Sequence, residues 1–186
     1  MEIIMTVTFN RKAPETEPKA RSKVTKAEAT LPTVPIEGHT RPLVSYGEVF
    51  RATHGERFAL LSEGLRANVL FSTINDLGIP QERVFQVLKL PRSSMLRIKK
   101  SASQHVLNRD EGSLVLGLRQ MIGQVEVMVK ESGAPEGFNA AKWLATWLET
   151  PNSALGGRLP ADYMHQKEGQ ELIAQLLSQI QSGAYA

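Results

Sequence analysis

Residues 66–100 read RANVLFSTINDLGIPQERVFQVLKLPRSSMLRIKK, and three helices are predicted within them. The apolar residues of 66–77 recur at spacings of three and four, which predicts a helix, and Gly78 suits the position just past its end. A second short helix is predicted over 81–88, and the leucine–proline pair that follows stops it. A third helix, predicted over 92–100, begins with polar and basic residues. The second and third of these helices are short and joined by a tight turn, which is typical of a helix-turn-helix.

The third helix of this stretch carries side chains suited to reading DNA. The second helix of a helix-turn-helix enters the major groove, so its outward side chains must donate to base edges and phosphates. Arginine can bind guanine with two hydrogen bonds, while serine and lysine mainly contact phosphate. The predicted DNA-binding residues are Arg92, Ser93, Ser94, Arg97, Lys99 and Lys100. The alternative is an ordinary basic, solvated helix face.

Two residues depart from the usual helix-turn-helix pattern. Counting from Gln81, the fifth position is usually small and the ninth is usually glycine, but here they are Phe85 and Lys89. A phenylalanine at the crossing is expected to widen the angle between the helices. Lys89 must adopt a backbone geometry that glycine takes more easily.

The remainder of the chain also predicts helices. Residues 111–131 form an amphipathic pattern. Asn139 is the expected cap of a helix within 139–148, and residues 167–182 place leucine and isoleucine on one side of a helix. Ordered structure is expected from about Ser45. Its first apolar anchors are Val49, Phe50, Phe58, Leu61 and Leu65, interrupted by Gly55 and Gly64. No convincing strand and no internal repeat is found, so we predict an all-α protein.

The amino-terminal segment has the composition of a disordered tail. Residues 10–42 are polar, contain five prolines and sustain no helical period. Such a segment buries too little apolar surface to offset the entropy of ordering. We predict disorder over 1–44, with Arg21, Lys23 and Lys26 either adding general attraction to DNA or serving no specific role.

Composition narrows the class of protein. The 186 residues include 41% hydrophobic residues and no cysteine, which fits a reducing cytoplasm. No apolar run approaches the roughly 18–20 residues that a membrane-spanning helix needs, so we expect a soluble, cytoplasmic protein without a membrane partner. Residues 46–109 hold ten basic and five acidic groups, whereas 110–186 hold five and nine. A basic part followed by an acidic part suggests two surfaces with different partners, although uneven charge can also be functionless.

The residues available for catalysis are few. The four histidines, at 39, 54, 105 and 165, are far apart, and none has metal-binding spacing. The three aspartates are scattered, and Gly156-Gly157 is a pair in a turn and not a phosphate-binding loop. We therefore expect no enzyme activity, no metal and no cofactor.

Residues 147–160, WLETPNSALGGRLP, form the most distinctive motif, and Glu168-Gly169 and a closing helix into Gly183 follow it. Trp143 and Trp147 are four residues apart; we assign Trp143 to the core and leave Trp147 available for a partner protein. The motif resembles the toxin-binding domain of the Xre/MbcA/ParS antitoxin family, with Lys167 in place of the family's usual threonine. Residues 63–132 are similar to the amino-terminal region of the same family.

The resemblance implies an antitoxin of a type II toxin–antitoxin system. Its partner would be a RES-domain toxin that consumes NAD by glycohydrolysis, phosphorolysis or ADP-ribosyl transfer, and the antitoxin would occlude the toxin's active site. The complex would bind operator DNA and repress its own operon, with a homodimer inside a hetero-oligomeric complex. The implied toxin-binding residues are Trp147, Leu148, Pro151, Asn152, Leu155, Gly156, Gly157, Arg158, Gly183, Tyr185 and Ala186.

The expected organisation has four parts. They are a disordered tail (1–44), an Xre-like helix-turn-helix DNA-binding domain (45–110), a linking amphipathic helix (111–136) and a toxin-binding domain (137–186). The alternative is a stand-alone helix-turn-helix transcription regulator whose last domain senses a small ligand. That alternative predicts a closed apolar pocket within 137–186.

Overall fold

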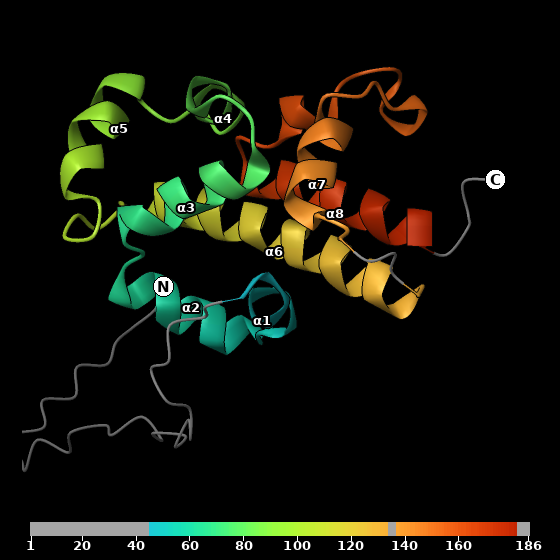
Figure 1. Ribbon diagram of the computed structural model, residues 1–186, viewed down its shortest axis with the longest axis horizontal. Helices are drawn as coiled ribbons and strands as arrows, with labels where there is room; N and C mark the ends of the chain where they lie inside the picture. The colour runs from blue at the N-terminus through green and yellow to red at the C-terminus, as the bar shows by residue number, and fades with distance from the viewer. Residues whose placement is uncertain (1–44, 134–136, 182–186) are drawn as a thin grey trace, which may run out of the picture. The chain divides into compact units, whose positions relative to one another are not determined.

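The computed structural model describes residues 45–133 and 137–181, and its regular structure is helical throughout these ranges (Figure 1). This confirms the predicted all-α class. The predicted tail, 1–44, lies outside the described residues. The α-helices are α1 (Tyr46–Arg51), α2 (His54–Glu63), α3 (Ala67–Leu77), α4 (Gln81–Val87), α5 (Arg92–Ile98), α6 (Arg109–Glu131), α7 (Ala140–Leu148) and α8 (Lys167–Gln181). Short 3-10 helices lie at η1 (Lys99–Ser101), η2 (Ser153–Leu155) and η3 (Pro160–Tyr163).

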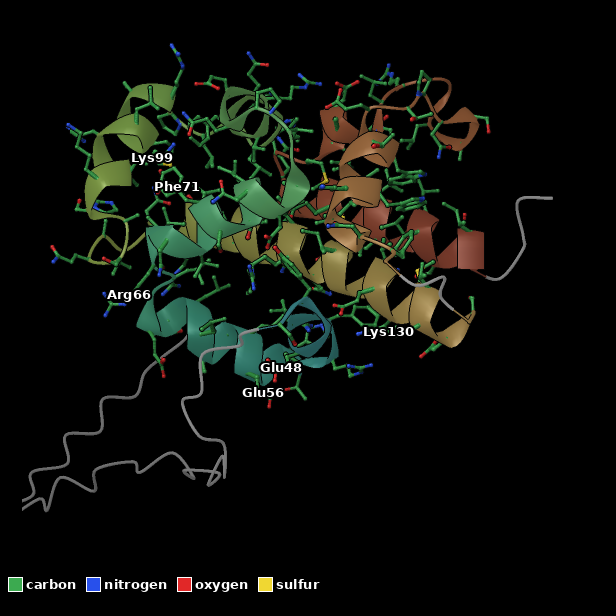
Figure 2. The ribbon with its side chains drawn as sticks, in the orientation of Figure 1. Glu48, Glu56, Arg66, Phe71, Lys99 and Lys130 are labelled. Carbon is green, nitrogen blue, oxygen red and sulfur yellow. The ribbon has the colours of Figure 1, made fainter. Side chains whose placement is uncertain are left out.

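Side-chain caps fix where several helices begin. The side chains of Ser45, Thr53 and Asn108 each accept a hydrogen bond from the backbone N–H of the glutamate three residues later. The side chain of that glutamate in turn accepts a hydrogen bond from the backbone N–H of the capping residue. The glutamates of the first two caps, Glu48 and Glu56, are labelled in Figure 2. Asn139 caps α7 by accepting from the Lys142 backbone, as predicted.

The helix α6 is the centre of the packing. Figure 1 shows it running along α3 and α7, and it also contacts α1, α2 and α8. The predicted apolar face is present, but burial extends beyond it to Val115, Leu116, Arg119, Gln124 and Val127. One cluster of buried residues therefore runs from Leu65 to Leu177 through helices from both halves of the chain.

Two buried glutamines join α6 to α8. The Gln170 amide donates to the carbonyls of Leu114 and Met164, at 3.1 and 2.9 Å. Further along, the Gln124 amide donates to Ala174 O at 3.0 Å and to Ser178 Oγ at 2.8 Å. Leu114 of α6 pairs with Gln170 near the start of α8, and Gln124 further along α6 pairs with Ala174 further along α8. The two helices therefore run parallel. The buried amides fix their register because each would be costly to leave unpaired.

A polar cluster holds α1 against α3 and α6. Tyr46 donates its hydroxyl to Asp76 Oδ2 at 2.5 Å, and the Arg119 guanidinium lies 4.4 Å from the centre of the Tyr46 ring. Arg119, which is 6% exposed, also donates to Thr73 Oγ1 at 2.9 Å. Burial, followed by the hydrogen bond to Asp76, raises the pKa of Tyr46 to about 12. Gly123 completes the contact, since a Cβ there would overlap the carbonyl oxygen of Tyr46.

The expectation that Phe58 anchors the core is wrong. Phe58 is 66% exposed, and none of the residues of α2 is fully buried. The helix instead rests on Leu61 and on the following Leu65, which face Gly112 of α6. Gly55 does not interrupt the helix but lies in its first turn. Among the described residues, no helix is both long and apolar enough to cross a membrane.

Candidate functional site

The turn between α4 and α5 has the backbone geometry that the sequence predicts. Lys89 has φ +50°, and it is the one non-glycine residue with positive φ in the described ranges. Two hydrogen bonds close the turn, from Lys89 N to Gln86 O and from Leu90 N to Phe85 O. Phe85 is 1% exposed, so the large residue at this position is part of the core.

The predicted DNA-binding side chains lie on the outer face of α5. Met95 and Ile98 are buried beneath the helix, whereas Ser93, Arg97 and Lys100 are exposed and Ser94 is half-buried. Arg92 is 67% exposed, and its guanidinium lies 3.8 Å from Glu82 of α4. The first turn of α5 and its outer face therefore present hydroxyl and guanidinium donors to solvent.

Lys99 contacts residues of α3 and α4. Its ammonium donates to Gln81 Oε1 at 2.7 Å and lies 5.8 Å from the centre of the Phe71 ring. Lys99 and Phe71 are labelled close together in Figure 2. Lys99 thus ties the end of α5 to α3 and α4, which makes it a less available phosphate ligand than Lys100.

The motif 147–160 folds into a loop organised by Asn152. The Asn152 side chain accepts from Ala154 N at 2.9 Å, its carbonyl accepts from Leu155 N and Gly157 N, and its N–H donates to Arg158 O. Gly156 and Gly157 have φ of 65° and 80°, a backbone region that favours glycine. The asparagine and the glycine pair therefore shape a rigid loop.

The side chains implied in toxin binding are divided between surface and core. Trp147 is half-buried and stacks on Trp143, with ring centres 6.2 Å apart and planes at 10°. Leu148 is 5% exposed and packs in the core, so its side chain supports the surface from beneath and is not available for direct contact. The remaining described members are half-buried or exposed around the loop: Pro151, Asn152, Leu155, Gly156, Gly157 and Arg158. Gly183, Tyr185 and Ala186 lie outside the described residues.

An ion pair that the sequence did not reveal joins this loop to α4. Arg83 donates from Nε to Glu149 Oε1 at 2.9 Å and from Nη2 to Glu149 Oε2 at 2.7 Å. The hydrogen bonds to Glu149 raise the pKa of Arg83, which keeps its charge fixed. Because the partners are 66 residues apart, no local sequence pattern could have paired them. The helix α4 is thus held to Glu149, the residue that follows α7.

Comparison with known proteins identifies the family of this chain. Residues 136–183 match the family model of the antitoxin Xre/MbcA/ParS C-terminal toxin-binding domain. The chain belongs to the Xre/MbcA/ParS antitoxin family, which confirms the resemblance found in residues 147–160. It is 37% identical over 150 residues to the "Prs ADP-ribosylating antitoxin" of Sphingobium sp. (strain YBL2), an alignment that covers 81% of this chain and 93% of that protein.

Proposed function

We propose that this antitoxin neutralises a cognate NAD-consuming RES-domain toxin by occluding its active site, and that it represses its own operon by binding DNA. The observation that carries the proposal is the similarity to a named antitoxin over 81% of the chain, together with the match of residues 136–183 to the toxin-binding domain. The protein acts by binding in the cytoplasm and has no enzymatic activity of its own.

The reaction of the toxin is narrowed by the name of the relative. That name refers to ADP-ribosylation, a transfer in which NAD donates the ADP-ribosyl group. Of the three NAD-consuming reactions that the family resemblance implies, ADP-ribosyl transfer is therefore the one that we assign to the toxin partnered by this chain.

Toxin binding would use the motif loop 147–160 as a preformed surface. Because hydrogen bonds of Asn152 already fix the loop, little conformational entropy is lost on binding. Trp147 and Leu155 would supply apolar area, and the exposed Arg158 a charged contact at the rim. Gly183, Tyr185 and Ala186 would enter the NAD cleft and exclude the substrate.

DNA binding would use α5 in the major groove, with Arg92 and Arg97 reading bases and Ser93, Ser94 and Lys100 holding phosphate. A homodimer would place two such helices on successive half-sites, one helical turn apart. The basic balance of residues 46–109 supports attraction to the polyanion.

The ligand-sensing alternative has less support. Two surface hollows, of about 470 and 220 Å³, are lined mainly by residues around Lys89 and α4. Neither is a closed apolar chamber formed by residues 137–186, where that alternative expects a ligand.

The proposal is tested by expressing the reading frame adjacent to this gene, alone and together with this chain. We expect growth arrest from the neighbour alone and normal growth when both are expressed. A harmless neighbour, or one that stays toxic beside this chain, contradicts the antitoxin function.

A further inference from the structure

The outer face of α5 carries one apolar side chain among its polar ones. Leu96 is 37% exposed, and it follows the exposed Arg92 by four residues and the exposed Ser93 by three, so the three share one face of the helix. The exposed Lys100 comes four residues after Leu96. Of the exposed large apolar residues in the described part of the chain, Leu96 is the one that lies between predicted DNA-binding residues.

Packing of α5 within the chain does not require the exposed part of Leu96. Met95 and Ile98 are buried and supply the apolar contact of this helix with the core. An exposed leucine by itself is ordinary, so its neighbours decide what partner would cover it. The neighbours of Leu96 on this face are guanidinium, hydroxyl and ammonium donors, which suit a partner rich in acceptors.

Charge favours a polyanion as that partner. Residues 83–109 contain seven lysine or arginine residues and no aspartate or glutamate. Glu82, which directly precedes this stretch, lies 3.8 Å from the Arg92 guanidinium. Four serines within 93–103 add hydroxyl donors that suit phosphate. A cationic stretch of this kind displaces the counterions of DNA, and a helix that presents it can enter the major groove.

We infer that Leu96 contacts the methyl group of a thymine in the major groove of the operator and is a specificity-determining residue of this antitoxin. The inference rests on the proposed function, in which α5 enters that groove. Thymine is the base that presents an apolar group there, and apolar side chains contact it. Burying Leu96 against that methyl group removes apolar area of both partners from water.

The helix geometry indicates where that thymine lies in the operator. Arg92 and Leu96 are about 6 Å apart along the helix axis at 1.5 Å per residue. This separation corresponds to about two base pairs of DNA. If Arg92 binds a guanine, we therefore expect the thymine contacted by Leu96 within about two base pairs of it.

The test measures the affinity of the full chain for the DNA upstream of this gene, prepared once with thymine and once with uracil, which lacks the methyl group. Fluorescence anisotropy at one fixed salt concentration gives both affinities. The original chain is expected to bind the thymine duplex about threefold to fourfold more tightly, as burial of one methyl group predicts. Leu96→Ala is expected to bind the two duplexes equally, and about as weakly as the original chain binds the uracil duplex.

Two further variants serve as controls. Leu96→Met keeps an apolar side chain of similar volume in the helix, so the preference for thymine should be retained. Leu172→Ala shortens a leucine of similar exposure, 39%, on α8, and it should leave both the affinity and the preference unchanged. Thermal melting of each variant shows that it is folded under the conditions of the binding measurement.

The outcomes separate the inference from the proposed function. If the original chain binds neither duplex, the proposed DNA binding itself fails. If it binds both duplexes equally well, DNA binding stands and the contact with a thymine methyl group is wrong. A preference for thymine that persists undiminished in Leu96→Ala would assign the methyl contact to another residue and also overturn the inference.

Discussion

Arg83 of α4 and Glu149 at the end of α7 form an ion pair with two hydrogen bonds, which links α4 to the motif loop 147–160. The two side chains are 37% and 35% exposed, so water screens part of their attraction. The geometry is nevertheless the fork-to-carboxylate arrangement that orients both partners. The loop proposed to bind the toxin and the helix pair α4–α5 proposed to bind DNA are therefore joined by a direct contact.

Glu149→Gln is expected to lower the free energy of unfolding by about 0.5–1 kcal/mol, because one half-exposed ion pair with good geometry is lost. The measurement is urea denaturation at neutral pH. Glu171→Gln is the matched control: its pair with Lys167 is longer and its side chain is 63% exposed, so we expect a change of no more than about 0.3 kcal/mol. Equal effects of the two substitutions would show that the Arg83–Glu149 pair has no special role.

Gly123→Ala is expected to destabilise the protein by about 3 kcal/mol, because the new Cβ would overlap the backbone carbonyl of Tyr46 and push α1 from α6. Thermal and urea unfolding check the effect. Gly55→Ala has ordinary contact distances in α2 and should be neutral or slightly stabilising. A Gly123→Ala protein as stable as the original would mean that α1 does not pack closely on α6.

Tyr46 makes stability depend on alkaline pH. Its pKa is raised from 10.0 to about 12 in the folded protein, so the folded state holds the phenolic proton more tightly than the unfolded state. The resulting stability is present below pH 10 and is lost as pH rises from 10 to 12. Tyr46→Phe should lose about 1 kcal/mol at neutral pH, with the hydrogen bond to Asp76, and should show a smaller loss between pH 10 and 12. Parallel stability curves for the two proteins over pH 10–12 would contradict the assignment.

Arg92→Ala/Arg97→Ala is expected to weaken binding to the DNA upstream of this gene by at least tenfold and to leave toxin neutralisation intact. Fluorescence anisotropy at several salt concentrations measures the first effect, and co-expression growth the second. Lys100→Ala should lower affinity and reduce the salt dependence by about one ion, as expected for one phosphate contact. Loss of neutralisation with Arg92→Ala/Arg97→Ala would identify α5 as a structural helix.

Local chemistry made much of the fold predictable from the sequence. Gly78 has the left-handed conformation expected at the end of α3, Asn139 caps α7, and Lys89 takes the strained geometry that its position requires. The caps at Ser45 and Thr53 also have a signal in the sequence, a glutamate three residues after each capping residue.

The features that could not be predicted from the sequence depend on contacts between residues that are distant along the chain. The sequence shows that Phe58 is apolar, but it does not show that no neighbouring residue covers its side chain. The pairing of Arg83 with Glu149 and the assignment of Leu148 to the core both require the arrangement of α4 and α7 in space. The motif 147–160 identified the family, whereas the structure explains Asn152, Gly156 and Gly157 as residues that build the loop.

The most direct test of the antitoxin function is the rate of NAD consumption by the purified product of the adjacent reading frame, titrated with this chain. We expect consumption to fall in proportion to added chain and to stop when the toxin is saturated, because the bound antitoxin excludes NAD from the cleft. NAD consumption that continues unchanged at saturating concentrations of the chain would contradict the account.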